Sequence, residues 1–341
     1  MRVGILLLLA GATTLVAPNA AMADAGAPDS VTSCLVERLT ETDKTWRLSI
    51  ATAADPSGRY VAGRGYPQDG GYARVPVLWD RGAPTVVKIP GIDQIINDVN
   101  ASGVAVASSY DEQTWEPLAP SIIRNGQASS LPGVASGTAN GINQRGDVVG
   151  ETADLQPVLW PARGIVGGTA VFLPLPKGAV GAEAHDIDDD GTVVGSQFDV
   201  NGIERATIWT PDGKVNVLPS LPGAADGSAA FTIRAGWITG RALSTDGAWQ
   251  QVRWQVTGEP QAFPRFDHLS NANASGWLVG SGLNQKPLLR ANSQYVELPG
   301  LAAAAEDSYD EATDISDDGR TIAGYATDEQ GALRAVRWTC L

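Results

Sequence analysis

The sequence predicts an all-β fold, a seven-bladed β-propeller with four antiparallel strands in each blade. Three observations support this prediction. A turn glycine recurs at steps of roughly 44 residues, short β-branched runs alternate with polar glycine turns, and helical periodicity is absent after the first residues. A ring of blades is the architecture that repeats a four-strand unit at this length.

The repeat has three recurring positions: a turn glycine, a second small residue four or five positions later, and an apolar residue, usually Trp, that ends the third strand-like element. The turn glycines are Gly58, Gly103, Gly146, Gly191, Gly236, Gly276 and Gly319. The second small residues are Gly63, Ala107, Gly150, Gly195, Gly240, Gly280 and Gly324. The apolar residues are Trp79, Ile123, Trp160, Trp209, Trp254, Leu289 and Trp338.

The copy that starts near His185 shows the strands most clearly. Its β-branched runs 192–194 and 207–208 are strand-like, and Asp190-Gly191 fits a tight hairpin between strands. Blades stack face to face, so we expect the recurring tryptophans to pack between neighbouring blades.

The first residues read as a secretory signal peptide, because a positive start at Arg2 and an apolar run precede the Ala21-Met22-Ala23 box. We therefore predict a signal peptide over residues 1–23, a short linker over 24–30, and one propeller domain over 31–341. The blade repeats are expected near residues 46–92, 93–137, 138–182, 183–227, 228–267, 268–307, and 308–341 plus 31–40.

The two ends of the chain are expected to meet. The seventh copy stops at Leu341 without a fourth strand, and the segment from Val31 to Leu39 is a spare strand-like run. Pairing the two removes both open sheet edges and brings Cys34 beside Cys340. An exported protein meets oxidising conditions, so we predict a Cys34–Cys340 disulfide and a secreted, extracellular location.

The net charge of −14 argues against nucleic acid as a partner, since nucleic-acid binding needs basic patches. After the signal peptide no segment approaches the ~20 apolar residues of a membrane span. We expect a monomer that has a glycan or a protein as ligand.

The motif resembles the extracellular repeat of the HAF type, a propeller-like repeat of secreted bacterial proteins. The matching stretches are residues 141–150 (GINQRGDVVG), 205–209 (RATIW) and 218–223 (LPSLPG), although the His-Ala-Phe tripeptide that names the repeat is missing. The resemblance implies a propeller-like fold and a location outside the cytoplasm. It implies no defined chemistry, so no catalytic residue is assigned.

Candidate ligand-binding residues lie in the loops expected on one face of the ring, where blades connect and where second strands lead into third strands. These loops concentrate aromatic and acidic side chains, a combination that suits a carbohydrate or a protein partner. The candidates are Tyr66, Tyr72, Tyr110, Trp115, Phe198 and Trp249.

A weaker candidate is a calcium site. Asp186, Asp188 and Asp190 precede Gly191 in a D-x-D-x-D-G run that starts like an EF-hand loop. The twelfth loop position is Gln197 rather than Glu, and sister copies hold ordinary polar turns. We therefore expect plain turns and no cofactor.

The leading functional hypothesis is a secreted, non-enzymatic binding module that holds a glycan or protein on the long-loop face. One alternative is a carbohydrate-active hydrolase or lyase on the same scaffold, although the sequence shows no G-x-S-x-G elbow and no phosphate-binding loop. A second alternative is a structural repeat protein without a specific ligand.

Overall fold

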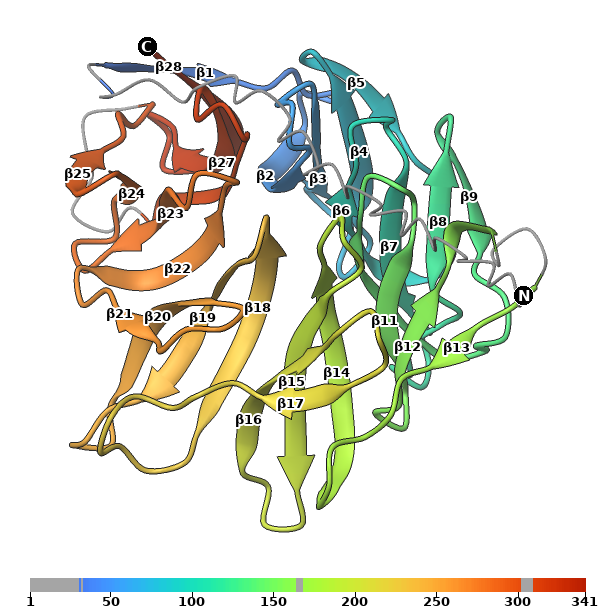
Figure 1. Cartoon of the computed structure of the whole chain (residues 1–341). Coiled ribbons are helices and arrows are strands. Elements are labelled where there is room, and N and C mark those ends of the chain that lie inside the picture. The colour runs from blue at the N-terminus through green and yellow to red at the C-terminus, as the bar shows by residue number, and fades with distance from the viewer. Residues whose placement is uncertain (1–30, 32, 164–167, 302–308) are drawn as a thin grey trace, which may run out of the picture.

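The computed structural model describes residues 31, 33–163, 168–301 and 309–341. They form seven four-stranded antiparallel sheets arranged as a ring around a central channel (Figure 1), which confirms the predicted seven-bladed propeller. The predicted signal peptide (1–23) and linker (24–30) lie outside the described residues. Within the described ranges no helix is long and apolar enough to cross a membrane.

Each blade runs from an innermost strand beside the channel to an outermost strand at the rim. The innermost strands of blades 1 to 7 are β2 (Trp46–Ala54), β6 (Ile92–Val99), β10 (Gly137–Ile142), β14 (Ala179–Ile187), β18 (Ser228–Arg234), β22 (Phe266–Ala272) and β26 (Glu311–Ile315). The second strands are β3 (Tyr60–Pro67), β7 (Ala105–Tyr110), β11 (Val148–Thr152), β15 (Val193–Asp199), β19 (Trp237–Leu243), β23 (Leu278–Gly282) and β27 (Thr321–Thr327). The third strands are β4 (Val75–Asp80), β8 (Ser121–Arg124), β12 (Pro157–Trp160), β16 (Glu204–Trp209), β20 (Trp249–Gln255), β24 (Pro287–Ala291) and β28 (Leu333–Cys340). The outermost strands are β5 (Ala83–Val86), β9 (Gln127–Ser130), β13 (Val171–Phe172), β17 (Val215–Val217), β21 (Gln261–Ala262), β25 (Gln294–Glu297) and, for blade 7, β1 (Cys34–Arg38).

The ring closes as predicted, because the N-terminal strand β1 completes blade 7. It pairs antiparallel with β28, and the register places Cys34 opposite Cys340. The two residues form a disulfide, with their Cα atoms 4.1 Å apart. Disulfides of this kind are typical of oxidising compartments outside the cytoplasm.

The second small residue of the repeat is required by a bulge in the innermost strand. In every blade the pairing between first and second strands shifts by one residue near the channel. A Cβ atom added at Gly150 would lie 2.0 Å from the carbonyl oxygen of Thr138, and one at Gly195 would lie 1.9 Å from that of Glu183. Glycine therefore permits the close backbone approach that the bulge needs.

The recurring tryptophans are buried between blades, and each indole nitrogen is hydrogen-bonded to the preceding blade. Trp160 Nε1 donates to the carbonyl oxygen of Pro132 at 2.8 Å, and Trp254 Nε1 donates to that of Pro219 at 2.9 Å. Trp209 and Trp338 make the same bond. The tryptophans therefore connect the third strand of one blade to the chain after the outermost strand of the blade before it.

The turns between first and second strands also connect blades. Asn143 Oδ1 accepts from the backbone N–H groups of Arg145 and Asp147, which fixes the turn, while its Nδ2 donates to the carbonyl oxygen of Asp188 in the next blade at 3.2 Å. Asn100 and Asn273 repeat both sets of bonds. One amide side chain thus serves as turn former and inter-blade link.

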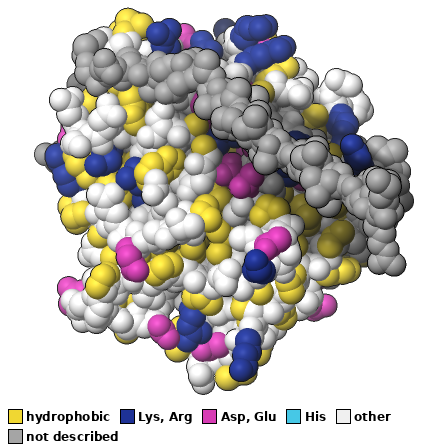
Figure 2. Space-filling model, viewed as in Figure 1, with side chains coloured by type: hydrophobic (Ala, Val, Ile, Leu, Met, Phe, Trp, Pro, Cys, Tyr) yellow, Lys and Arg dark blue, Asp and Glu magenta, His cyan; other side chains and the backbone are white. Residues whose placement is uncertain are grey.

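Antiparallel topology places these short turns on one face of the ring and the long loops on the other. We call them the short-turn face and the long-loop face. Figure 2 shows one face, on which charged side chains of both signs are scattered and acidic side chains lie near the middle of the ring.

Candidate functional site

The central channel is lined by the residues that the bulges turn inward. The bulged residues are Thr52, Asn97, Asn140, His185, Phe231, Ser270 and Thr313, one from each blade. They form a ring of side chains of unlike chemistry around the channel, so the interior is asymmetric although the backbone repeats.

Five of these seven side chains bond to a backbone carbonyl oxygen of the next blade and so form a belt around the channel. Asn97 Nδ2 donates to the carbonyl oxygen of Ala139 at 2.7 Å, and Asn140 Nδ2 donates to that of Ala184 at 3.0 Å. Thr52, His185 and Thr313 make the corresponding bonds. Phe231 has no hydrogen-bonding group, and Ser270 donates to the carboxylate of Glu311 in blade 7 rather than to a carbonyl oxygen, so the belt of carbonyl bonds is interrupted at blades 5 and 6.

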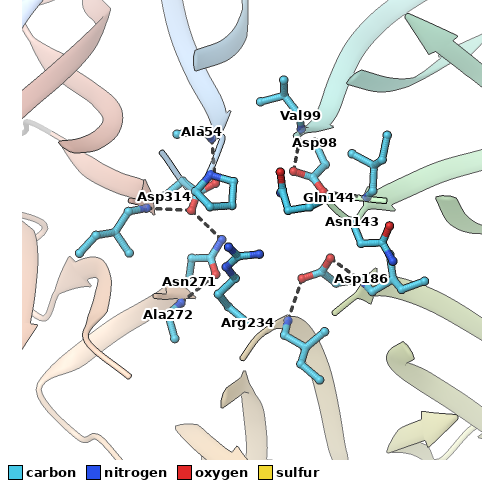
Figure 3. Close-up of a pocket in the computed structure, with 15 residues that line it drawn as sticks. Ala54, Asp98, Val99, Asn143, Gln144, Asp186, Arg234, Asn271, Ala272 and Asp314 are labelled. Atoms are coloured by element: carbon cyan, nitrogen blue, oxygen red, sulfur yellow. Dashed lines mark hydrogen bonds between the residues drawn. The ribbon is translucent and has the colours of Figure 1, made fainter. Parts of the chain in front are cut away.

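Toward the short-turn face, three carboxyl groups surround the channel (Figure 3). Each accepts a backbone N–H of the next blade: Asp98 from Ile142, Asp186 from Ile233, and Asp314 from Ala54, all at 2.7–2.8 Å. A cavity of about 50 Å³ lies among them. These carboxyl groups hold neighbouring blades together, and their oxygen atoms already accept hydrogen bonds.

Burial in the channel keeps protons on these groups at higher pH than usual. Desolvation raises the pKa of Asp314 to about 7 and that of Asp186 to about 6, and it raises the pKa of Asp98 well above its ordinary value. Mutual repulsion among the three adds to the effect.

Arg234 fills the channel beside these acids and points toward the middle of the ring (Figure 3). Its guanidinium donates to both carboxylate oxygens of Asp317 in blade 7 and, at 3.2 Å, to Asp189 in blade 4. The arginine comes from blade 5, so the ion pair with Asp189 joins adjacent blades and the ion pair with Asp317 reaches past blade 6. They narrow the channel at the short-turn face.

On the long-loop side the channel widens into a cavity of about 310 Å³, within the size range of small-ligand sites. Its wall contains Asn97, Asn140, His185, Phe231, His268, Ser270, Glu311 and threonines. Most of these side chains have hydrogen-bonding groups, and Phe231 is the aromatic ring among them. We refer to this space as the channel-mouth pocket.

One wall of the channel-mouth pocket is organised by Glu311. This buried carboxylate accepts from His268 Nδ1 at 2.5 Å, from Ser270 Oγ at 2.7 Å and from the hydroxyl of Tyr325. Burial alone would raise the pKa of Glu311, but these donors outweigh it and lower the pKa. The hydrogen bond from Glu311 also raises the pKa of His268. The carboxylate of Glu311 therefore favours the protonated form of His268, and both residues line the channel-mouth pocket.

The opposite wall carries a second imidazole–carboxylate pair. His185 Nδ1 donates to the carbonyl oxygen of Ala230 at 2.7 Å, and its Nε2 lies 3.1 Å from a carboxylate oxygen of Glu183. Burial lowers the pKa of His185, but these two bonds outweigh it and raise the pKa. Nearby, desolvation raises the pKa of Glu151 to about 7, although Asn140 donates to it at 2.7 Å.

Phe231 lies between the two imidazole–carboxylate pairs. A cation–π stack leads from its ring toward the outside of the pocket. The Arg241 guanidinium lies 5.8 Å from the Phe231 ring centroid and 4.4 Å from that of Trp249. Glu204 pairs with Arg241 at 3.1 Å and orients it. Trp249, 45% exposed, is therefore connected to the pocket through Arg241 and Phe231.

The other predicted ligand-binding residues do not gather at one point. Tyr72 and Trp115 form an edge-to-face pair with centroids 4.6 Å apart, and both are exposed. Tyr66 is covered by the guanidinium groups of Arg64 and Arg74. Tyr110 and Phe198 are half-buried at the ends of their second strands. Of the six candidates, the structure connects Trp249 to the channel-mouth pocket.

The predicted calcium residues Asp186, Asp188 and Asp190 are used in different hydrogen bonds. Asp186 faces the channel, Asp188 accepts from the backbone N–H groups of Ala235 and Gly236 in blade 5, and Asp190 accepts from Thr192. Across the described part of the chain, no group of three or more His, Cys, Asp or Glu residues is placed to hold a metal ion.

Sequence reasoning did not identify Phe231, Ser270, Glu311 or Asn140 as wall residues. The signal that finds them is the bulge: each wall residue lies just before or within the one-residue shift opposite the second small residue of the repeat. Counting back from Gly150, Gly240, Gly280 and Gly324 in a known bulge register locates them.

Comparisons with known proteins show the fold. No protein-family model matches the sequence, so the resemblance to the HAF repeat stays a prediction. No curated protein matches it either. Among solved structures, the β-propeller domain of the Trilobed protease from Pyrococcus furiosus is similar, with a TM-score of 0.55, 10% identity, and coverage of 85% of this chain and 95% of that one.

Two further solved structures share the propeller. A puromycin hydrolase S511A mutant complexed with PGG has a TM-score of 0.56 at 12% identity over 88% of this chain and 54% of that chain. The Dos1 propeller has a TM-score of 0.50 at 10% identity over 89% of this chain and 95% of that one. At these identities the likeness is one of fold. The Pyrococcus domain is described as having an open velcro topology, whereas β1 and β28 pair in this chain.

Proposed function

We propose that this protein is an exported, non-catalytic binding module that takes a sugar unit of a glycan into the channel-mouth pocket. The observation that carries the proposal is the wall of that pocket, where amide, hydroxyl, imidazole and carboxylate groups surround the phenyl ring of Phe231. A pyranose presents hydroxyl groups at its edge and C–H bonds on its face, and this wall offers partners for both.

The pocket fits a sugar better than a large apolar ligand. Its volume of about 310 Å³ is at the lower end for small-ligand sites, and most lining side chains are polar. The stack from Phe231 through Arg241 to Trp249 extends from the pocket toward the long-loop face. A second sugar unit of the same chain is placed on Trp249 in this proposal, which keeps the aromatic loop residue of the sequence hypothesis.

The test is binding of neutral oligosaccharides on a glycan array, followed by calorimetry on the retained glycans. Phe231→Ala is expected to weaken binding about tenfold or more, since a stacked aromatic contact contributes roughly 1–3 kcal/mol with its burial. Trp249→Ala is expected to weaken binding to longer oligosaccharides more than to monosaccharides. The matched control is Phe172→Ala, because Phe172 is an exposed aromatic residue on the outermost strand of blade 3, away from the pocket.

Retention of no neutral glycan by the wild type, or equal binding by wild type and Phe231→Ala, would overturn the proposal. Far-ultraviolet circular dichroism and a melting curve for each variant separate loss of binding from loss of folding.

A carbohydrate-active hydrolase or lyase is the second candidate, and one observation favours it. Glu151, whose pKa burial raises to about 7, and the His185–Glu183 pair place proton donors and acceptors beside the same pocket. Incubation of each retained glycan with the protein distinguishes the two candidates. Products formed by wild type and lost in Glu151→Gln indicate an enzyme, whereas unchanged glycan indicates binding alone.

A further inference from the structure

The seam between blades 5 and 6 differs from the other seams because the recurring inter-blade residues are replaced there. Phe231 occupies the bulge position whose side chain in five other blades bonds to the next blade, and it has no hydrogen-bond donor. Arg234 occupies the position held by Asn143 in blade 3, and Leu289 occupies the position of the recurring tryptophan. The side chains of Gln251 and Arg253 provide hydrogen bonds across this seam instead, to Asp267 and Gly276.

Three arginines alternate with three aromatic rings along the outer part of this seam. Arg253 lies over Trp237 and Phe263, with centroid distances of 4.1 and 5.3 Å. Arg290 lies over Phe263 at 4.9 Å and over Tyr295 at 5.9 Å. Arg265 lies over Tyr295 at 4.5 Å. We call these six residues the arginine–aromatic ladder.

The ladder has no counter-charge among the described residues. Elsewhere Arg205, Arg234, Arg241 and Arg334 each pair with a carboxylate within 3.2 Å. No described carboxylate lies at ion-pair distance from Arg253, Arg265 or Arg290. Arg253 donates to two neutral oxygens, those of Gly276 and the Gln261 side chain. Three guanidinium groups without a described carboxylate partner thus lie close together in a protein whose net charge is −14.

The like charges also affect one another. Burial, with a contribution from Arg290, lowers the pKa of Arg253 to about 10. Aromatic faces compensate part of the desolvation of a guanidinium, but a buried cation is stabilised much more by an anion with hydrogen-bond acceptors. A bound anionic group would therefore stabilise these guanidinium groups further.

A cavity of about 230 Å³ adjoins the ladder at Arg265. Arg265 forms part of its wall, and Asn284 and Glu297, joined by a 2.9 Å hydrogen bond, form another part. Leu283 and Leu288 supply apolar surface. The cavity thus offers a cation for an acidic group, an amide and a carboxylate for hydroxyl groups, and apolar contact for a ring face.

We propose that the arginine–aromatic ladder binds an acidic sugar chain, whose carboxylate or sulfate groups pair with Arg265 and Arg290 and one of whose sugar units enters the adjoining cavity. Arginine forms two parallel hydrogen bonds with such oxyanions, and the aromatic rings that stack on these guanidinium groups hold them in place. This site lies at the outer seam of blades 5 and 6 and is independent of the channel-mouth pocket.

The test compares three probes of the same length: an oligouronate, its methyl ester, and a sulfated oligosaccharide. Methyl esterification removes the charges and keeps the sugar rings. Calorimetry at about 0.15 M salt limits electrostatic attraction to roughly 8 Å, so the ligand senses the ladder rather than the net charge of the whole protein. We expect both charged probes to bind at least about tenfold more tightly than the ester.

Two variants locate the site. Arg290→Gln removes a charge that makes no hydrogen bond to another described side chain, and it is expected to weaken oligouronate binding about tenfold. Arg265→Gln tests the cavity end in the same way. The matched control is Arg124→Gln, because Arg124 holds the corresponding position in the third strand of blade 2 without an aromatic ladder, and its binding should equal that of the wild type.

Melting curves without ligand show whether each variant is folded, and the Arg290→Lys variant provides a second readout, since restored charge without the planar fork should recover part of the affinity. Equal binding of the ester and the oligouronate overturns the proposal, as does unchanged binding by both Arg290→Gln and Arg265→Gln. Tighter binding of a single-stranded oligonucleotide than of either acidic sugar also overturns it and assigns the ladder to nucleic acid.

Discussion

The indole Nε1 of Trp79 donates a hydrogen bond to the backbone carbonyl oxygen of Thr40, with 2.7 Å between the two atoms. In blades 3, 4, 5 and 7 the equivalent bond reaches a proline carbonyl after the outermost strand of the preceding blade. Thr40 follows β1, the strand that completes blade 7. Blade 1 therefore bonds to blade 7 through the same tryptophan contact that joins neighbouring blades elsewhere in the ring.

Trp79→Phe removes this bond and keeps an aromatic ring in the same core cluster. We expect a loss of about 2–4 kcal/mol in the free energy of unfolding, because a buried acceptor loses its donor and the smaller ring leaves a cavity. Urea unfolding followed by far-ultraviolet circular dichroism, rather than by tryptophan fluorescence, measures this loss in the free energy of unfolding. A loss below about 0.5 kcal/mol would show that the Trp79–Thr40 bond does not contribute to closure.

The disulfide is expected to stabilise the same closure by a different route. Cys34 and Cys340 are separated by 306 residues, so in the chain-entropy model the crosslink contributes on the order of 5 kcal/mol through the unfolded state. The Cys34→Ala/Cys340→Ala protein should unfold at lower urea and with a larger m-value, since its unfolded chain is more expanded. Non-reducing peptide mapping that finds two free thiols in the wild type would contradict the bond itself.

The sequence predicts the ring but not what its channel does, and the reason is visible in individual residues. Gly58, Gly146 and Gly191 all adopt positive φ in the turns, so their spacing reports the blade directly. Cys34 and the missing last strand predict closure for the same kind of local reason. Wall residues such as Phe231 and Ser270 carry no local signature, because their inward orientation depends on a bulge in the strand pairing.

The aromatic loop candidates show a second limit of sequence reasoning. Trp249 and Tyr66 read alike in the sequence, as exposed aromatic residues on loops. In the structure, arginines stack on both, but Trp249 continues toward Phe231 whereas Tyr66 is enclosed by Arg64 and Arg74. The arginines that separate the two cases come from neighbouring strands, and sequence periodicity does not pair them with a particular ring.

Asn143 and Asp188 occupy equivalent turn positions in blades 3 and 4, but one needs a hydrogen-bond donor and the other needs acceptors. Asn143 needs an amide donor for the carbonyl oxygen of Asp188, whereas the carboxylate of Asp188 accepts two backbone N–H groups from blade 5. We expect Asn143→Asp and Asp188→Asn each to lower the free energy of unfolding by about 1–3 kcal/mol, since each change sets like groups against each other.

Thermal and urea unfolding of the two single variants check this prediction, with Asn201→Asp in an exposed turn as the control. Aspartate keeps the turn bonds that Asn143 Oδ1 accepts. If Asn143→Asp has the same stability as the wild type, those turn bonds are stabilising and the hydrogen bond to the next blade is not.

The channel carboxyl groups predict that this protein is most stable at mildly acidic pH. An acid whose pKa is raised by folding binds its proton more tightly in the folded state, so the free energy of unfolding falls as pH rises from the ordinary value to the folded value. For Asp314 this window runs from about 4 to about 7, and for Asp186 it ends at about 6. The raised pKa values of His185 and His268 add a loss of stability above their ordinary value, near pH 6.5.

Asp314→Asn removes one of these groups and should reduce the slope of unfolding free energy against pH between 4 and 7. Asp212→Asn serves as the control, because Lys214 and Thr210 lower the pKa of that exposed carboxyl to about 2, outside this window. Urea unfolding at half-unit pH steps gives both slopes. A wild-type stability that rises steadily from pH 4 to 7 would contradict the assignment, because it requires carboxyl groups that gain, rather than lose, favourable interactions when they ionise in the fold.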